Sequence, residues 1–228
     1  GALPQSHGGL RSALSEHKSK LLLQEYGIPT PQEAIVQSAD EAAEAAGRIG
    51  FPVVMKIESD DILHKSDIGG VMLNIRDAAA ARDAFIMLLK NAAEKQPDAR
   101  INGILVQKML PDGLEFIVGV SRDPLLGPMV LCGLGGILVE LYRDVALYPA
   151  PLSKAEALGM IGSLKASRLL GGYRGRPVLD IDALANAIVD VGRLAAEQPV
   201  AEVDINPLFV YEKGHGVAAA DGLVVIER

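Results

Sequence analysis

Short runs of β-branched residues alternate with helix-forming stretches along most of this chain, and this alternation limits the fold more than any other feature. The runs 51–57, 104–110 and 114–123 are typical of strands, whereas 77–95 and 180–197 are typical of helices. The runs 104–110 and 114–123 are separated by Pro-Asp-Gly, which predicts a hairpin between them. The sequence therefore predicts an α/β fold with some α+β character rather than a purely doubly wound sheet.

The composition excludes several classes of protein. The net charge is −7 over 228 residues, which disfavours nonspecific binding to nucleic acid or to an anionic membrane. A single cysteine, Cys132, excludes an internal disulfide framework and fits a reducing compartment. No apolar run approaches the length of a membrane span, and the N-terminus lacks the layout of a signal peptide. We expect a cytoplasmic, soluble protein.

The chain ends differ from the middle. Residues 1–12 are small and polar without periodicity, so we interpret them as a linker or a cloning remnant from a longer protein. Ser15 then predicts the start of a helix as its N-cap. Another helix is expected around 153–168, and two final strands are expected on either side of the turn 213–216.

Lys56 stands inside an otherwise apolar strand. Burying an unpaired ammonium group is expensive, so this lysine must either reach solvent or face an anion. An outward-facing lysine on a half-exposed strand is the alternative, and the strand alone does not decide between them.

His64 lies in a polar segment with glycines at Gly69 and Gly70. A histidine on a mobile loop flanked by glycines, next to Lys65, suits contact with phosphate or service as a nucleophile. The alternative is an ordinary surface histidine, which is the more common case for a lone residue of this kind.

Oxygen-bearing side chains alternate near the C-terminus. Glu202, Asp204 and Asn206 share one face of a strand, because side chains in a strand repeat with a period of two. A hairpin can return Asp221 beside Asp204, and hard oxygen ligands of this kind suit Mg²⁺. A solvated edge of the sheet is the alternative.

The segment Gly133-Leu134-Gly135-Gly136 follows an apolar strand, as glycines do in dinucleotide-binding turns. It lacks a third glycine at the required spacing, so a Rossmann fold is disfavoured. The sequence also contains no phosphate loop of the GxxxxGK[ST] type, no HExxH and no CxxC.

Taken in order, these features resemble the ATP-grasp fold. Residues 13–228 look like the ATP-grasp part of the ADP-forming (NDP-forming) acyl-CoA synthetases, which are relatives of the succinyl-CoA synthetase β subunit. The stretches that carry the resemblance are SKLLLQEYGIP, GFPVVMKIESDDILHKSDIGGVMLNI, GLEFIVGVSRDPLLGPMVLCGLGGILVE, LLGGYRGRP and EVDINPL. It implies two lobes with nucleotide between them, one at about 25–104 and the other at about 105–228 together with the first helix.

The resemblance also implies roles for single residues. Lys56 would bind the phosphates of ATP or ADP, Glu115 would face the ribose, and Asn206 and Asp221 would hold Mg²⁺ with Asp204 adjacent. The adenine would rest on Gln107, Lys108 and Met109, and the phosphates would lie near Gly69, Gly70, Gly133, Gly135, Gly136 and Glu140. Arg122, Asp123 and Arg174 match family motifs to which we assign no role.

His64 matches the second station of a phosphohistidine relay in this family. The reaction implied is acyl-CoA + ADP + phosphate ⇌ carboxylate + CoA + ATP. A CoA-binding partner subunit or domain would carry the first histidine and bring CoA and acyl-CoA to the enzyme, and the assembly could be oligomeric.

Two alternatives stay open at this point. One is a regulatory ATP-grasp module within a synthetase-like protein lysine acetyltransferase. The other is an ATP-grasp carboxylate–amine ligase, which works through acyl phosphates without a histidine relay, so the HKSD segment counts against it.

Overall fold

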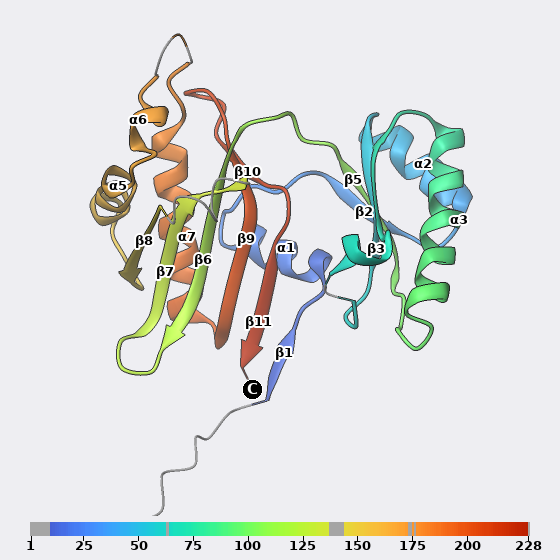
Figure 1. The fold of residues 1–228 in the computed structure, drawn as a ribbon, viewed down its shortest axis with the longest axis horizontal. Helices are drawn as coiled ribbons and strands as arrows, with labels where there is room; N and C mark the ends of the chain where they lie inside the picture. The colour runs from blue at the N-terminus through green and yellow to red at the C-terminus, as the bar shows by residue number, and fades with distance from the viewer. Residues whose placement is uncertain (1–9, 63, 137–143, 173–174, 176, 228) are drawn as a thin grey trace, which may run out of the picture.

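Two sheets of antiparallel strands form the framework of the protein (Figure 1). The computed structural model describes residues 10–62, 64–136, 144–172, 175 and 177–227. Their strands are β1 (Arg11–Ala13), β2 (Glu33–Val36), β3 (Val53–Glu58), β4 (Val71–Ile75), β5 (Gly103–Lys108), β6 (Leu114–Asp123), β7 (Gly127–Leu134), β8 (Val145–Pro149), β9 (Val200–Val210), β10 (Val217–Ala219) and β11 (Leu223–Glu227). Their helices are α1 (Glu16–Glu25), α2 (Ala39–Ile49), the 3₁₀ helix η1 (Lys65–Ile68), α3 (Ala78–Lys95), α5 (Lys154–Ser163), α6 (Ser167–Leu170) and α7 (Ile181–Glu197).

The smaller sheet has the strand order β2-β5-β3-β4. Its helices α2 and α3 begin where Ser38 and Asp77 accept hydrogen bonds from backbone N–H groups of the first turn. Gly50, with a φ of 90°, lets the chain leave α2 in a conformation that other residues avoid. The alanine-rich faces of both helices pack on Val53, Met55 and neighbouring apolar side chains of the sheet. The opposite face of this sheet is therefore left for polar groups.

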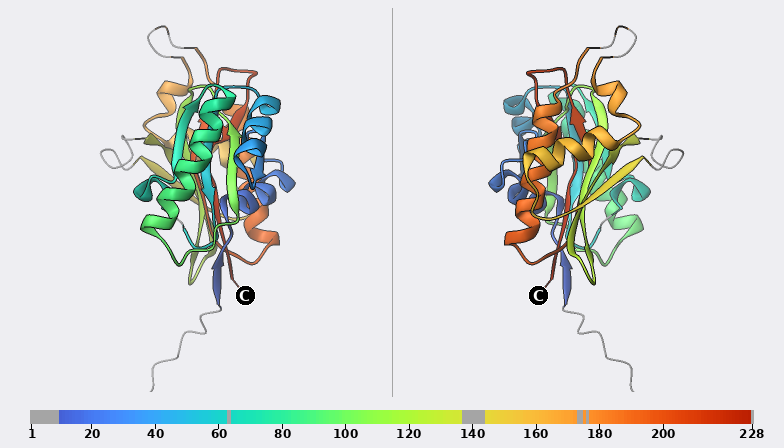
Figure 2. Two further views of the ribbon diagram at one scale, coloured as in Figure 1. Left: turned by 90° about the vertical axis from the view of Figure 1, so that its right-hand side faces the viewer. Right: turned by 90° about the vertical axis from the view of Figure 1, so that its left-hand side faces the viewer.

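The larger sheet has the order β1-β11-β9-β6-β7-β8, with β10 paired to β9. Helices α5 and α7 cover one face of it, and Phe116 and Leu184 belong to the core between them. Figure 2 shows α3 in front of one sheet from one side, and α5 and α7 in front of the other sheet from the opposite side. The two helix layers therefore lie on the outside, and the free faces of the sheets carry the candidate site.

Helix α1 contacts both sheets. Ser15 caps its N-terminus as predicted, with its Oγ accepting from the Lys18 N–H at 3.4 Å. Near the C-terminal end, Leu23 and Tyr26 belong to the core of the larger sheet, and the Ser19 Oγ accepts from the Val224 N–H of β11. The N-terminal half carries charged side chains toward the smaller sheet. Among the described residues, no helix is long and apolar enough to cross a membrane.

The structure confirms the mixed α/β class and corrects several details. β5 and β6 do not form the predicted hairpin, because β5 pairs with β2 and β3 whereas β6 pairs with β7 and β9. The Pro-Asp-Gly segment is an extended link between the sheets, so the change of sheet falls after Lys108 and not at 104/105. Residues 11 and 12 of the presumed linker form the edge strand β1 together with Ala13. The helix expected over 153–168 is divided into α5 and α6, and β8 was not predicted.

Candidate functional site

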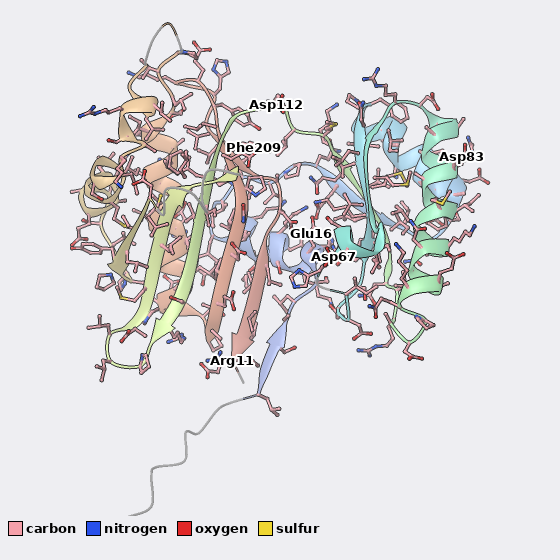
Figure 3. The ribbon with its side chains drawn as sticks, in the orientation of Figure 1. Arg11, Glu16, Asp67, Asp83, Asp112 and Phe209 are labelled. Atoms are coloured by element: carbon pink, nitrogen blue, oxygen red, sulfur yellow. The ribbon has the colours of Figure 1, made fainter. Side chains whose placement is uncertain are left out.

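Lys56 does not point into solvent. Its Nζ donates to the Glu16 Oε1 at 2.8 Å, and the Lys65 Nζ donates to the other oxygen, Oε2, at 2.7 Å. All three side chains are buried, and Figure 3 shows Glu16 in the region between the two sheets. The exposed-lysine alternative is therefore wrong, because an anion from α1 faces this strand.

The contacts extend into a larger group of buried charges. Lys20, with an exposure of 0%, donates to the Glu16 Oε1 and the Glu33 Oε2 at 2.7 Å and to the Gln107 Oε1 at 2.5 Å. The His17 Nδ1 lies 2.7 Å from the Glu33 Oε1. We call the following residues the ion cluster: Glu16, His17, Lys20, Glu33, Lys56, Glu58, Lys65 and Gln107.

Charge in the ion cluster is nearly balanced. Burial alone would raise the pKa of Glu16, but attraction by Lys56, Lys20 and Lys65 outweighs burial and holds that pKa well below its ordinary value. The Glu58 Oε2 is buried without a hydrogen-bond partner among the described residues, and the Lys65 Nζ lies 3.8 Å from it. The cluster therefore stabilises the charged form of Glu16 and leaves one buried acceptor without a hydrogen bond among the described residues.

His64 is exposed and directly precedes η1, whose first residue, Lys65, turns its ammonium group into the ion cluster. The glycines that follow are packed. The Gly70 N–H donates to the Lys65 carbonyl at 2.7 Å, and the Asn91 side chain donates to the Gly69 carbonyl at 2.9 Å. A Cβ on Gly70 would lie 2.8 Å from the same Lys65 carbonyl. These glycines therefore allow close packing beside η1, and the mobility of the loop stays a prediction.

The segment predicted to hold adenine is divided between two environments. Gln107 belongs to the ion cluster, and its Nε2 donates to the Ala220 carbonyl at 3.3 Å. The Lys108 Nζ donates instead to the Gly50 carbonyl at 2.7 Å, where α2 ends. Met109 is half-buried. Its neighbours Gln107 and Lys108 thus make structural contacts, and the adenine role of this segment stays a prediction.

Glu115 and the glycine segment after β7 contact one another. The Gly135 N–H donates to the Glu115 carbonyl at 2.6 Å, and a Cβ on Gly135 would lie 3.0 Å from that oxygen. A Cβ on Gly136, whose φ is +72°, would lie 3.1 Å from the Glu115 Oε2. A larger residue at either position would force atoms of Glu115 to shift. That Glu115 and the glycine segment belong to one nucleotide site stays a prediction. Two other predicted residues, Glu140 and Arg174, lie outside the described residues.

Arg122 stabilises the pairing of β6 with β9, and Asp123 stabilises the turn between β6 and β7. The Arg122 Nε donates to the Val200 carbonyl at 2.6 Å, and the Asp123 Oδ1 accepts from the N–H groups of Leu125 and Leu126. These contacts give both motif residues a structural role in the larger sheet.

The oxygen-bearing side chains lie on the free face of the larger sheet. Glu202 and Asn206 are exposed and Asp204 is partly buried, while the residues between them are buried, so the predicted alternation holds up to Asn206. Asp204 pairs with Gly119 of β6 and with Leu223 of β11, and Asp221 lies two residues before Leu223. The hairpin predicted from the sequence therefore does return Asp221 to Asp204.

The charge on this face fits a divalent cation. Burial raises the pKa of Asp204, and the nearby carboxylates of Glu202 and Asp221 raise it further. None of the ion pairs between described residues places a lysine or arginine on these three carboxylates. The described residues contain no cluster of three or more His, Cys, Asp or Glu side chains arranged to hold a metal alone. Mg²⁺ commonly uses one or two carboxylates with phosphate oxygens and water, so Asp204, Asp221 and the Asn206 amide fit this ion.

Sequence reasoning missed Glu16, Lys20, Glu33 and Glu58. Their partners lie far away in the sequence, as for the Lys20 and Gln107 side chains, which are separated by 87 positions. One signal was present: Glu16 and Lys20 are four residues apart and so share one face of the helix with Leu23. An ion pair on the apolar face of a helix indicates burial.

Comparison with known proteins establishes the class. Residues 6–226 match the family model of the ATP-grasp domain, so the chain belongs to the ATP-grasp family. The chain is similar to the β subunit of ADP-forming acetate–CoA ligase I from Pyrococcus furiosus. The two are 48% identical over 200 residues, which cover 87% of this chain and 86% of that subunit. This confirms the predicted family and makes the chain the β-subunit-like part of a ligase.

Solved structures agree with this result. Acetyl-coenzyme A synthetase 1 from Ca. Korarchaeum cryptofilum, in complex with coenzyme A and Ca-AMPCP, is 43% identical, with a TM-score of 0.90 over 95% of this chain and 94% of that chain. A structure of the same synthetase with coenzyme A and Mg-AMPPCP is 40% identical, with a TM-score of 0.82 over 95% and 93% of the two chains. In that structure the phosphohistidine segment points towards the nucleotide-binding site.

Proposed function

We propose that this chain binds ATP or ADP with Mg²⁺ and transfers a phosphoryl group, as the β-type part of an ADP-forming acyl-CoA synthetase. The observation that carries the proposal is the contact between Gln107 and the Ala220 carbonyl. Gln107 lies on the face of the smaller sheet that carries Lys56. Ala220 directly precedes Asp221, which lies near Asp204 on the free face of the larger sheet. The contact therefore supports a single site, with the lysines of the ion cluster on one side and the proposed Mg²⁺ ligands of the larger sheet on the other.

The two sides suit the chemistry of phosphoryl transfer. Catalysis of this reaction depends on positioning and on neutralising charge on the phosphates. The Lys56 ammonium has three N–H donors and uses one of them on Glu16, so it can contact a phosphate while it stays paired. When bound at Asp204, Asn206 and Asp221, Mg²⁺ would neutralise phosphate oxygens.

His64 would accept the phosphoryl group. Its imidazole is exposed, and an unprotonated imidazole nitrogen is a nucleophile. The group would then pass between the nucleotide and a histidine of a CoA-binding partner subunit or domain. The resemblance to β subunits of acetate–CoA ligases supports this reaction over that of a carboxylate–amine ligase.

Calorimetry with Mg-AMPPCP tests the proposal. A charge-assisted contact with phosphate is worth about 1.5–3 kcal/mol, so Lys56→Met should weaken binding roughly 10- to 100-fold. Asn206→Ala combined with Asp221→Ala should abolish the dependence of binding on Mg²⁺. His64→Ala is the control, because it should bind Mg-AMPPCP normally while losing the acid-labile label that γ-labelled ATP leaves on the unchanged protein. Equal affinity in the Lys56 variant, or label that survives the loss of His64, would contradict the assignment.

A further inference from the structure

One carboxylate holds both ends of the segment that carries His64. β3 ends two residues after Lys56, the chain crosses to η1, and η1 begins at Lys65, directly after His64. The Glu16 Oε1 accepts from Lys56 and the Oε2 accepts from Lys65. A single side chain of α1 thus fixes the lysine before the segment and the lysine after it.

The helix that supplies this carboxylate is anchored on the other sheet. Leu23 is buried in the core of the larger sheet, and Ser19 accepts a hydrogen bond from β11. The distances from Glu16 to the two lysines therefore depend on how α1 and the larger sheet sit against the smaller sheet. In protein kinases, a strand lysine that contacts phosphate is likewise positioned by a glutamate on a helix.

We propose that Glu16 is a positioning residue for phosphoryl transfer, which holds the ammonium groups of Lys56 and Lys65 at the nucleotide phosphates and at His64. This inference rests on the proposed function, since it requires Lys56 to contact phosphate. Glu16 itself does not touch the nucleotide. It acts by fixing two lysines from one helix.

Loss of Glu16 should leave a pH signature. Lys56 is faced by Glu16 and Lys20 from α1, by Lys65 from η1 and by Glu58 on its own strand, with Glu33 and His17 beyond Lys20. Burial lowers the pKa of Lys20, but attraction by Glu16 and Glu33 raises it above its ordinary value. Without the Glu16 carboxylate, the buried lysines therefore repel one another and this group gives up a proton more readily as pH rises. Nucleotide affinity should then fall as pH rises from about 7.5 to 9.5, above the range in which histidine titrates.

The variants are designed to keep the buried charges balanced. Glu16→Gln alone leaves an excess of buried lysines and can prevent folding, so it is combined with Lys65→Met. Lys65→Met alone is the reference for the double variant. Lys18→Ala is the matched control, because Lys18 also joins α1 to the segment after β3, through an exposed pair with Asp60 at 3.0 Å, but does not contact Lys56.

Calorimetric titration of the complete protein with MgADP decides the question. We expect the double variant to bind roughly tenfold more weakly than Lys65→Met, with a further loss of affinity toward pH 9.5, while Lys18→Ala matches the unchanged protein at every pH. A double variant that binds MgADP like Lys65→Met across this range overturns the positioning role. If Lys56→Met also binds normally, the phosphate role of Lys56 fails, and the proposed function must be revised with it. If Lys56→Met loses affinity for MgADP while the double variant binds like Lys65→Met, only the role of Glu16 is overturned.

Discussion

Lys20 offers the most direct measure of what the ion cluster contributes to stability. Its ammonium group is fully buried and has three acceptors within 2.7 Å, on Glu16, Glu33 and Gln107. Lys20→Met keeps a side chain of similar length and removes the charge together with its N–H donors. Removing one partner of a buried ion pair leaves the other charges buried without a partner. We therefore expect the free energy of unfolding to fall by about 3–5 kcal/mol. For a chain of this size, that corresponds to a fall in Tm of roughly 6–20 °C.

Urea unfolding and calorimetry measure this loss. Lys90→Met is a matched control, because Lys90 pairs with Glu94 at 3.9 Å on the exposed surface of α3, where such pairs contribute about 0–0.5 kcal/mol. A second change, Glu33→Gln, should recover part of the loss by removing a stranded carboxylate. A decrease of less than about 1 kcal/mol in the free energy of unfolding would refute the reasoning. It would mean that water or a rearrangement supplies the buried acceptors with new hydrogen-bond donors.

Two further predictions concern the larger sheet. The pKa of Asp204 is raised in the folded state by burial and by Glu202 and Asp221, so its ionised form destabilises the protein at neutral pH, and that cost disappears as pH falls below the ordinary range of an aspartate. Asp204→Asn should therefore raise Tm in EDTA at pH 8 and remove the further rise that Mg²⁺ produces; a lower Tm would contradict this. Gly119→Ala should cost about 1–3 kcal/mol in urea unfolding, because its Cβ would lie 2.7 Å from the Val203 carbonyl. Gly159→Ala in α5, where nothing lies within 4 Å, should instead stabilise the protein by about 0.5–1 kcal/mol, and equal effects would contradict the steric argument.

Local signals in the sequence predicted the helices and many strands well. The N-caps Ser15, Ser38 and Asp77 accept hydrogen bonds within the first turns, so the starts of these helices depend on neighbouring residues alone. The strand over 114–123 was also predicted with its exact bounds. Its partner was not, because strand pairing depends on residues far along the chain. The Pro-Asp-Gly segment can form either a tight turn or an extended link, and local sequence does not distinguish these.

In the candidate site, too, features set by neighbouring residues were predictable and contacts between distant residues were not. Alternation along β9 was enough to place Glu202, Asp204 and Asn206 on one face, since that pattern is local. The pairing of Lys56 with Glu16 was not predictable, because the two residues are 40 positions apart and meet only when α1 packs on the smaller sheet. The sequence left two possibilities for Lys56, which could reach solvent or face an anion. The structure places an anion there, and this anion is part of the protein itself.

The arrangement of strands along the chain has a consequence for folding during synthesis. All strands of the smaller sheet lie between Glu33 and Lys108, so this sheet can assemble before the second half of the chain has been made. The larger sheet cannot, because β6 requires β9, and β1 at one edge pairs with β11, where Arg11 lies opposite Glu227. Strands β6 and β7 can pair with each other, but the larger sheet stays incomplete until β9 and β11 have been made. Until then their apolar faces are exposed to other chains, and a ribosome pausing before β9 would prolong this exposure.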